Sequence, residues 1–74
     1  MNTQHIFFNG SVEVGTGEPG YRWVNGYSEV TADGYTNPVP LKDQRAMANR
    51  DGRKLVQHDS ESEARKALLA EAAQ

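Results

Sequence analysis

This chain of 74 residues has no cysteine, one tryptophan, two histidines and no long apolar run. Without cysteine it cannot form disulfides, and His5 and His58 alone cannot supply the four Cys or His ligands of a closed structural zinc site. A chain this short buries only about 60% of the surface that its unfolded form exposes. Residues 1–74 are therefore predicted to form a single small domain whose core holds the fold alone or with a partner's help.

Targeting and membrane-spanning signals are also missing. The segment Met1 to His5 has neither the basic region nor the apolar stretch of a secretory signal. No apolar stretch approaches the ~20 residues that span a bilayer. The sequence thus predicts a cytoplasmic protein with no membrane contact.

Aromatic and helix-forming residues are segregated along the chain. All six aromatic residues lie in the first half, whereas alanine and long charged side chains dominate the second. This segregation is typical of an α+β fold, in which an antiparallel sheet is covered by helices on one face. We predict three or four strands and two helices on one face, in the approximate order β-β-β-(β)-α-β-α.

The first expected strand, Gln4 to Val14, alternates between two faces as a half-buried strand does. One face carries Ile6, Phe8, Val12 and Val14, and the other carries Phe7, Ser11 and Glu13. The dipeptide Asn9-Gly10 favours a tight turn, so the segment is either one bulged strand or two very short ones. We favour one long strand.

A second Asn-Gly pair predicts a β-hairpin. Tyr21 to Val24 and Tyr27 to Thr31 flank Asn25-Gly26, which would place Val24 opposite Tyr27 and Arg22 opposite Glu29. Trp23 is then expected in the core. Asp33-Gly34 predicts another turn, with a short strand from Tyr35 that ends at Pro38.

The second half predicts helix, strand and helix. Pro40 suits a first helical turn, Leu41 to Arg50 contains good helix formers, and Asp51-Gly52 supplies the stop. Lys54 to His58 follows as a strand. Ser60 and Glu63 then form a capping box.

The last helix is predicted to pack by a stripe of small residues, with Glu61 and Arg65 paired on its surface. The stripe consists of Ala64, Ala67, Leu68 and Ala72. Leu68 is the expected anchor, and Leu68→Ala should cost about 2 to 4 kcal/mol.

Three motifs resemble catalytic or ligand sites. Gly15 to Gly20 matches G-x-G-x-x-G, but no helix follows it, so a strand connection is favoured over a nucleotide loop. His58, Asp59 and Ser60 have the residue types of a hydrolytic triad, but adjacent residues point in different directions. A metal pair of His5 and His58 would require the first and last strands to be neighbours. We predict no catalytic residue, no cofactor and no metal site.

Two sets of residues are candidates for partner binding. The basic block from Lys42 to Lys54 carries five cations and two aspartates, and such a cluster could neutralise phosphates. Its cations are Lys42, Arg45, Arg50, Arg53 and Lys54. The second set is Tyr21, Trp23, Tyr27 and Tyr35, because tyrosine and tryptophan dominate interface hot spots.

The stretch Tyr21 to Leu69 resembles small uncharacterised proteins of bacteriophages and prophages. The resemblance rests on the expected Trp-bearing hairpin, short helix and strand, and on the run from His58 to Arg65. It implies a compact protein, in the host cytoplasm if phage-encoded, that binds and blocks a host protein. CRISPR effectors and other defence systems are among the targets of such proteins.

The sequence therefore predicts a non-enzymatic accessory protein that binds and inhibits a host protein. The alternative is a small nucleic-acid-binding accessory protein that uses the basic block, although the sequence pI of about 5.5 lies below that of dedicated binders. Exposed sheet edges and a thin alanine-rich helix face also predict a homodimer.

Overall fold

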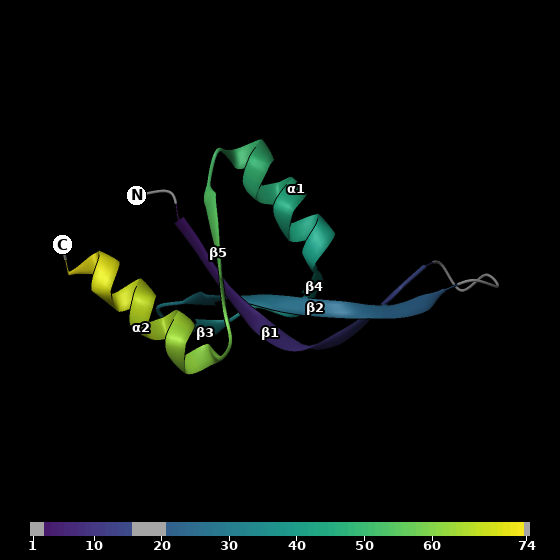
Figure 1. Ribbon diagram of the computed structural model, residues 1–74, viewed down its shortest axis with the longest axis horizontal. Helices are drawn as coiled ribbons and strands as arrows, with labels where there is room; N and C mark the ends of the chain where they lie inside the picture. The colour runs from purple at the N-terminus through teal and green to yellow at the C-terminus, as the bar shows by residue number, and fades with distance from the viewer. Residues whose placement is uncertain (1–2, 16–20, 74) are drawn as a thin grey trace.

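The computed structural model describes residues 3–15 and 21–73. Within them the elements are β1 (Thr3–Val14), β2 (Arg22–Thr31), β3 (Gly34–Tyr35), β4 (Val39–Pro40), α1 (Leu41–Asp51), β5 (Lys54–His58) and α2 (Glu61–Ala72) (Figure 1). The α+β class and the approximate element order are confirmed. β4 is additional, because Pro40 closes a two-residue strand instead of lying inside α1.

The described strands form one mixed sheet. Its order is β3-β2-β1-β5, and β4 also pairs with β2. β1 is antiparallel to β2 but parallel to β5, so the prediction of a purely antiparallel sheet with three or four strands is wrong. The cause is α1, which carries the chain back between β4 and β5 so that both run in the same direction as β1.

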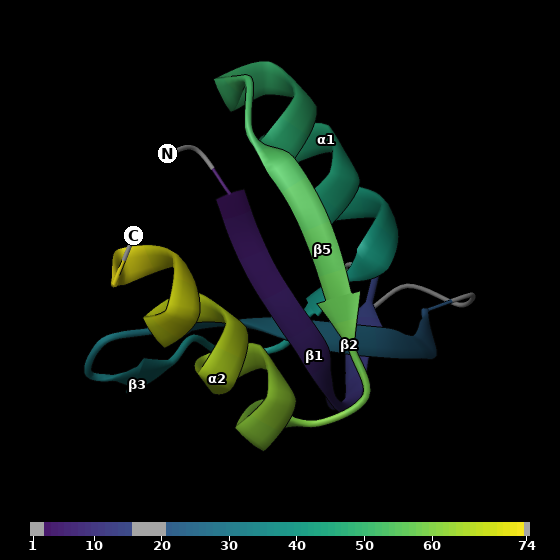
Figure 2. The same cartoon turned by 60° about the vertical axis from the view of Figure 1, so that its left-hand side comes forward.

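The two helices cover opposite faces of the sheet (Figure 2). On one face, Gln4 Nε2 donates to Gln44 Oε1 of α1 at 2.6 Å. On the other face, Phe7 packs with Val30 and with Ala64 of α2. Successive strand residues point to opposite faces, so β1 is buried on both sides. The prediction of two helices on one face is therefore wrong, because a central strand needs cover on both.

β1 is one long strand with a bulge, as predicted. Its pairing with β2 shifts between Phe8 and Ser11, and Gly10 has a φ of 110°. The extra residue in β1 reverses the face to which each following side chain of β1 points. Val12 therefore lies opposite Val24 and not opposite Trp23. The expectation that Val12 shares a face with Ile6 therefore fails beyond the bulge.

The predicted hairpin at Asn25-Gly26 does not exist, because β2 runs through this dipeptide without a turn. Arg22 lies opposite Val14 of β1, not opposite Glu29. Gly26 is needed for close approach: a Cβ there would lie 2.8 Å from Pro38 Cβ and 3.0 Å from Val12 Cγ1. The glycine thus allows close approach of Val12 in β1 and of Pro38, just before β4, and does not form a turn.

The predicted stop of α1 and the predicted Ser60 cap of α2 are confirmed, whereas the carboxylate of Glu63 reaches the amide of Asp59 and not that of Ser60. Gly52 caps α1 with a φ of 68°, and its amide donates to backbone carbonyls of the last turn. At the start of α2, Glu63 N donates to Ser60 Oγ at 3.2 Å, while Glu63 Oε2 accepts from Asp59 N at 3.3 Å.

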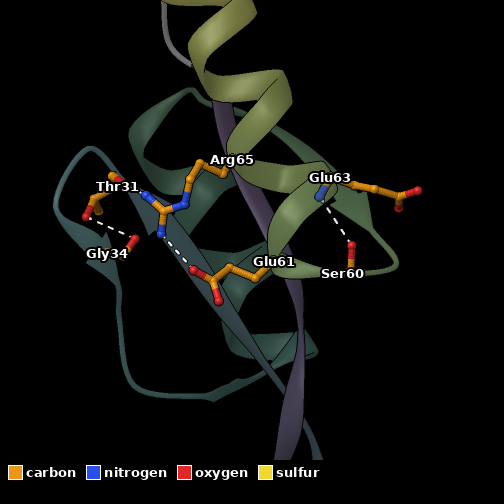
Figure 3. A network of polar contacts seen from close by, with 6 residues as sticks. All are labelled: Thr31, Gly34, Ser60, Glu61, Glu63 and Arg65. Carbon is orange, nitrogen blue, oxygen red and sulfur yellow. Dashed lines mark hydrogen bonds and ion pairs between the residues drawn. The ribbon is translucent and has the colours of Figure 1, made fainter.

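Arg65 fastens the first turns of α2 to the sheet. Its Nη2 donates to Glu61 Oε2 at 2.7 Å, which confirms the predicted pair, and its Nη1 donates to Thr31 O at 3.3 Å (Figure 3). The second bond reaches the end of β2. Because the helix is held there and packed through Ala64, it cannot rotate freely over the sheet.

Candidate functional site

The outer parts of β1 and β2 form an arm, defined here as residues 11–15 and 21–25. It extends away from both helices and lies along the 49 Å longest dimension of the structure (Figure 1). Its cross-strand pairs include Val12 with Val24 and Glu13 with Trp23. No residue of the arm is fully buried. Its side chains are therefore available to another molecule.

The most exposed aromatic side chain, Trp23, lies on this arm. Trp23 is 67% exposed, so the prediction that it belongs to the core is wrong. Tyr21, which precedes β2, is also exposed. The physical reason is that the arm has no helix over it.

Trp23 belongs to an aromatic stripe that continues into the body of the sheet. Trp23 and Tyr27 share a face of β2 because they are four residues apart. Phe8, 45% exposed, lies directly opposite Tyr27, with the rings edge to face at 5.7 Å. We call Trp23, Tyr27 and Phe8 the aromatic stripe.

Tyr35 is separated from this stripe. Tyr35 belongs to β3 and pairs with Val30 of β2, and its ring meets Phe7 edge to face with the centroids 5.4 Å apart. Phe7 is on the α2 face of the sheet, opposite to that of Phe8. The structure therefore divides the four aromatic candidates between two faces.

A hollow of about 500 Å³ lies between the arm and the start of α1. Its apolar wall contains Val14, Val24 and Leu41, and its cations are Arg22 and Lys42. Asn25, Tyr27, Pro40 and Asp43 complete the lining. Volumes in this range accommodate small ligands or a side chain of a partner.

The basic block is not one continuous surface. Arg50 Nε lies 3.1 Å from Asp51 Oδ1, and Arg53 Nη1 lies 3.6 Å from Glu29 Oε2. The hydrogen bond from Arg50 lowers the pKa of Asp51 below its ordinary value, with a smaller contribution from the charge of Arg53. Lys42, by contrast, lies at the hollow.

A chain of polar contacts joins β1, β5 and α2. His5 Nδ1 lies 3.0 Å from His58 Nε2, and His5 Nε2 lies 2.9 Å from Glu71 Oε1. Among the described residues, no group of three or more His, Asp or Glu side chains is placed to hold a metal ion. A metal pair of His5 and His58 requires the first and last strands to be neighbours. This requirement is met, because β1 pairs with β5.

The other two motifs carry no site geometry. Ser60 Oγ accepts the capping bond from Glu63 N, so it serves as a helix cap. Thr16 to Gly20, most of the glycine-rich motif, lie outside the described residues, and the predicted strand connection there stays a prediction.

Sequence reasoning missed several residues of these sites. Phe8 was expected only as a sheet residue and Arg22 only as a cross-strand ion pair. Glu71 gave no local indication at all, because it meets His5 from 66 positions away. Only the pairing of β1 with β5 brings the two histidines together.

Comparisons of the chain with protein-family models, with curated proteins and with solved structures found no match. Among the described residues, no helix has the length and apolar character needed to cross a membrane.

Proposed function

We propose that this protein is a non-enzymatic binding protein that attaches to another protein through its arm, with Trp23 as the anchor. One observation carries the proposal: the chain's only tryptophan is 67% exposed on a ribbon outside the helix-covered part of the sheet. Tryptophan is among the residues most enriched in interface hot spots. Phe8, 45% exposed, and Tyr27 add aromatic surface on the same face of the sheet.

The free energy available at Trp23 is large for one side chain. Burying most of an indole releases on the order of 4 kcal/mol at ~25 cal/mol per Å². Because the arm is only two strands wide, it fits an apolar groove of the partner better than a flat surface. Arg22 and Lys42 beside the hollow would then favour an acidic group on the partner.

Charge favours a protein partner over nucleic acid. Among its described residues the arm carries one charge of each sign, Glu13 and Arg22. Two arginines of the basic block already face carboxylates. Nucleic-acid binding through Lys42 to Lys54 is thus the weaker candidate, and a gel shift tests it: binding that falls steeply with added salt would support it.

The resemblance to phage and prophage proteins supplies the setting of the proposal. In that setting the partner is a protein of the bacterial host, and binding blocks its activity. A host defence component such as a CRISPR effector is the partner class that the resemblance implies. The exposed stripe supports binding in general, and the choice of partner rests on the resemblance alone.

The test is affinity capture from a lysate of the bacterial host, with three forms of the full chain. Wild type and Leu69→Ala should retain the same specific protein, whereas Trp23→Ala should lose it. Leu69 is the matched control because it is also a large exposed apolar residue, 59% exposed, but on α2. Equal capture by all three forms, or none by wild type, would refute the proposal.

Intrinsic fluorescence gives a second measurement on the purified complex. Trp23 is the only tryptophan, so its emission should shift to shorter wavelength and resist quenching when a partner covers it. The predicted homodimer must be separated from this effect. Light scattering of the free protein over a range of concentrations does so, because a monomer mass throughout would refute self-association.

A further inference from the structure

β1 and β5 hold two imidazole rings head to head. His5 Nδ1 and His58 Nε2 are 3.0 Å apart, and the ring centroids are 5.2 Å apart with the ring planes tilted by 38°. The parallel register explains the arrangement: His58 pairs with Phe7, and His5 lies two residues before Phe7 on the same face. Both rings therefore lie on the sheet face that α2 covers.

Glu71 determines which nitrogen of His5 is free. A carboxylate only accepts hydrogen bonds, so His5 Nε2, 2.9 Å from Glu71 Oε1, must carry a proton and donate it. In neutral His5 the lone pair is then on Nδ1, the atom that faces His58. His5 is 4% exposed, so its ring orientation is fixed by packing as well as by this bond.

The same geometry suits a metal ion. Two imidazoles on one tetrahedral ion, with metal–nitrogen bonds of about 2.0 to 2.1 Å, place their nitrogens about 3.3 Å apart. The observed 3.0 Å differs from this by a few tenths of an ångström. A carboxylate on the far nitrogen of a ligating histidine is the usual outer partner, since it orients the ring and strengthens the ligand.

We propose that His5 Nδ1 and His58 Nε2 bind a divalent transition metal ion, with Glu71 as the orienting residue behind His5. Imidazole ligands suit zinc, nickel and copper. Two protein nitrogens leave coordination positions for water or for a group from a partner. Solvent can reach the site because His58 is only half-buried at the end of the edge strand β5.

The ion would connect the first strand of the described chain to the last. It would replace the hydrogen bond between the two imidazoles, and the proton of His58 would move to its outer nitrogen. A ligand that binds only the folded chain raises stability, so metal should raise the melting temperature. This inference concerns the α2 face and is independent of the arm.

The experiment is titration of the tag-free full chain with Zn²⁺ and with Ni²⁺ by isothermal calorimetry. Wild type should bind one ion per chain. His58→Gln should lose saturable binding, and Glu71→Gln should bind about 10-fold more weakly. Gln57→Ala is the control, because Gln57 is exposed on the same strand and points to the other face.

Nitrogen NMR of the wild-type imidazoles identifies the atoms and does not depend on any variant folding. On addition of Zn²⁺, the signals of His5 Nδ1 and His58 Nε2 should shift together. Three results would overturn the proposal: no saturable binding by wild type, unchanged affinity in His58→Gln, or binding without movement of these two signals.

Discussion

The inner and outer halves of β1 belong to one strand but differ in what covers them. From Gln4 to Phe7 every residue is buried, because α1 lies over one face of the strand and α2 over the other. From Ser11 to Val14 every residue is half-buried or exposed. The difference shows that the same extended backbone serves the core where helices cover it and remains available for binding where they do not.

Of these two regions, the arm depends on the helix-covered body of the sheet, and not the reverse. A two-stranded ribbon is marginally stable in water by itself. The arm keeps its register because β1 and β2 continue into the helix-covered sheet (Figure 1). Substitutions in the body should therefore change stability, and substitutions in the arm should change binding.

Phe7→Ala should have the largest effect. Phe7 is 5% exposed and packs on Val30 and Ala64, so truncation removes a buried ring and costs about 3 to 5 kcal/mol. Urea unfolding measures the loss. Phe8→Ala is the matched control, because Phe8 is 45% exposed and should lose only about 1 to 2 kcal/mol. Equal losses of stability in the two variants would contradict the burial of Phe7 on one face of β1 and the exposure of Phe8 on the other.

Gln44→Ala should be next. The Gln44 side chain accepts from Gln4 Nε2 at 2.6 Å and donates to Tyr27 O at 2.7 Å. Its removal leaves buried polar groups without a partner, at a cost of about 1 to 3 kcal/mol. Arg45→Ala, one residue further along the helix and exposed, provides the comparison in the same urea experiment. If both variants lose the same amount, this polar contact does not hold α1 to the sheet.

Leu68→Ala should cost about 1 to 2 kcal/mol, less than its sequence suggests. Leu68 is only partly buried beside the core, and Ala64 is the fully buried residue of α2. Thermal unfolding followed by circular dichroism measures the effect, with Leu69→Ala as the exposed comparison. A loss near 4 kcal/mol would restore Leu68 as the anchor of the helix.

Ser60→Ala should cost about 1 kcal/mol through the lost cap of α2. Ser62→Ala should be neutral or slightly stabilising, because Ser62 is exposed within the helix and alanine is the better helix former. The pair of variants is compared by thermal unfolding. Identical melting temperatures would argue that the bond to Glu63 N contributes nothing.

Trp23→Ala should have the smallest effect on stability, within about 0.5 kcal/mol, although it should abolish partner capture. Its side chain is 67% exposed, so truncation removes little buried surface. Urea unfolding of this variant is the direct test of the contrast between arm and body. A loss of 2 kcal/mol or more would make Trp23 a structural residue.

Elements determined by neighbouring residues were predictable from the sequence. The stop at Gly52, the strand Lys54 to His58 and the cap at Ser60 each depend on a few adjacent side chains, and the structure confirms all three. The bulge in β1 was predictable for the same reason, since Gly10 is free to adopt a positive φ.

Elements determined by distant residues were not predictable. The role of Gly26 depends on Pro38 and Val12, so the dipeptide Asn25-Gly26 gave a false turn. Exposure of Trp23 depends on where the helices lie, which no local pattern specifies. The sequence predicted that His5 and His58 would meet only if the first and last strands were neighbours. Only the pairing of β1 with β5 showed that they are.

The parallel pairing of β1 with β5 also has a consequence for the order of folding. Thr3 pairs with Lys54, 51 positions later, so this edge of β1 finds its strand partner only after most of the described chain has been synthesised. Pairings between distant segments close large loops and slow the folding of small domains. Until β5 and α2 have been synthesised and have packed against β1, the apolar residues around Phe7 are uncovered. The nascent chain is then at its most vulnerable to aggregation and proteolysis.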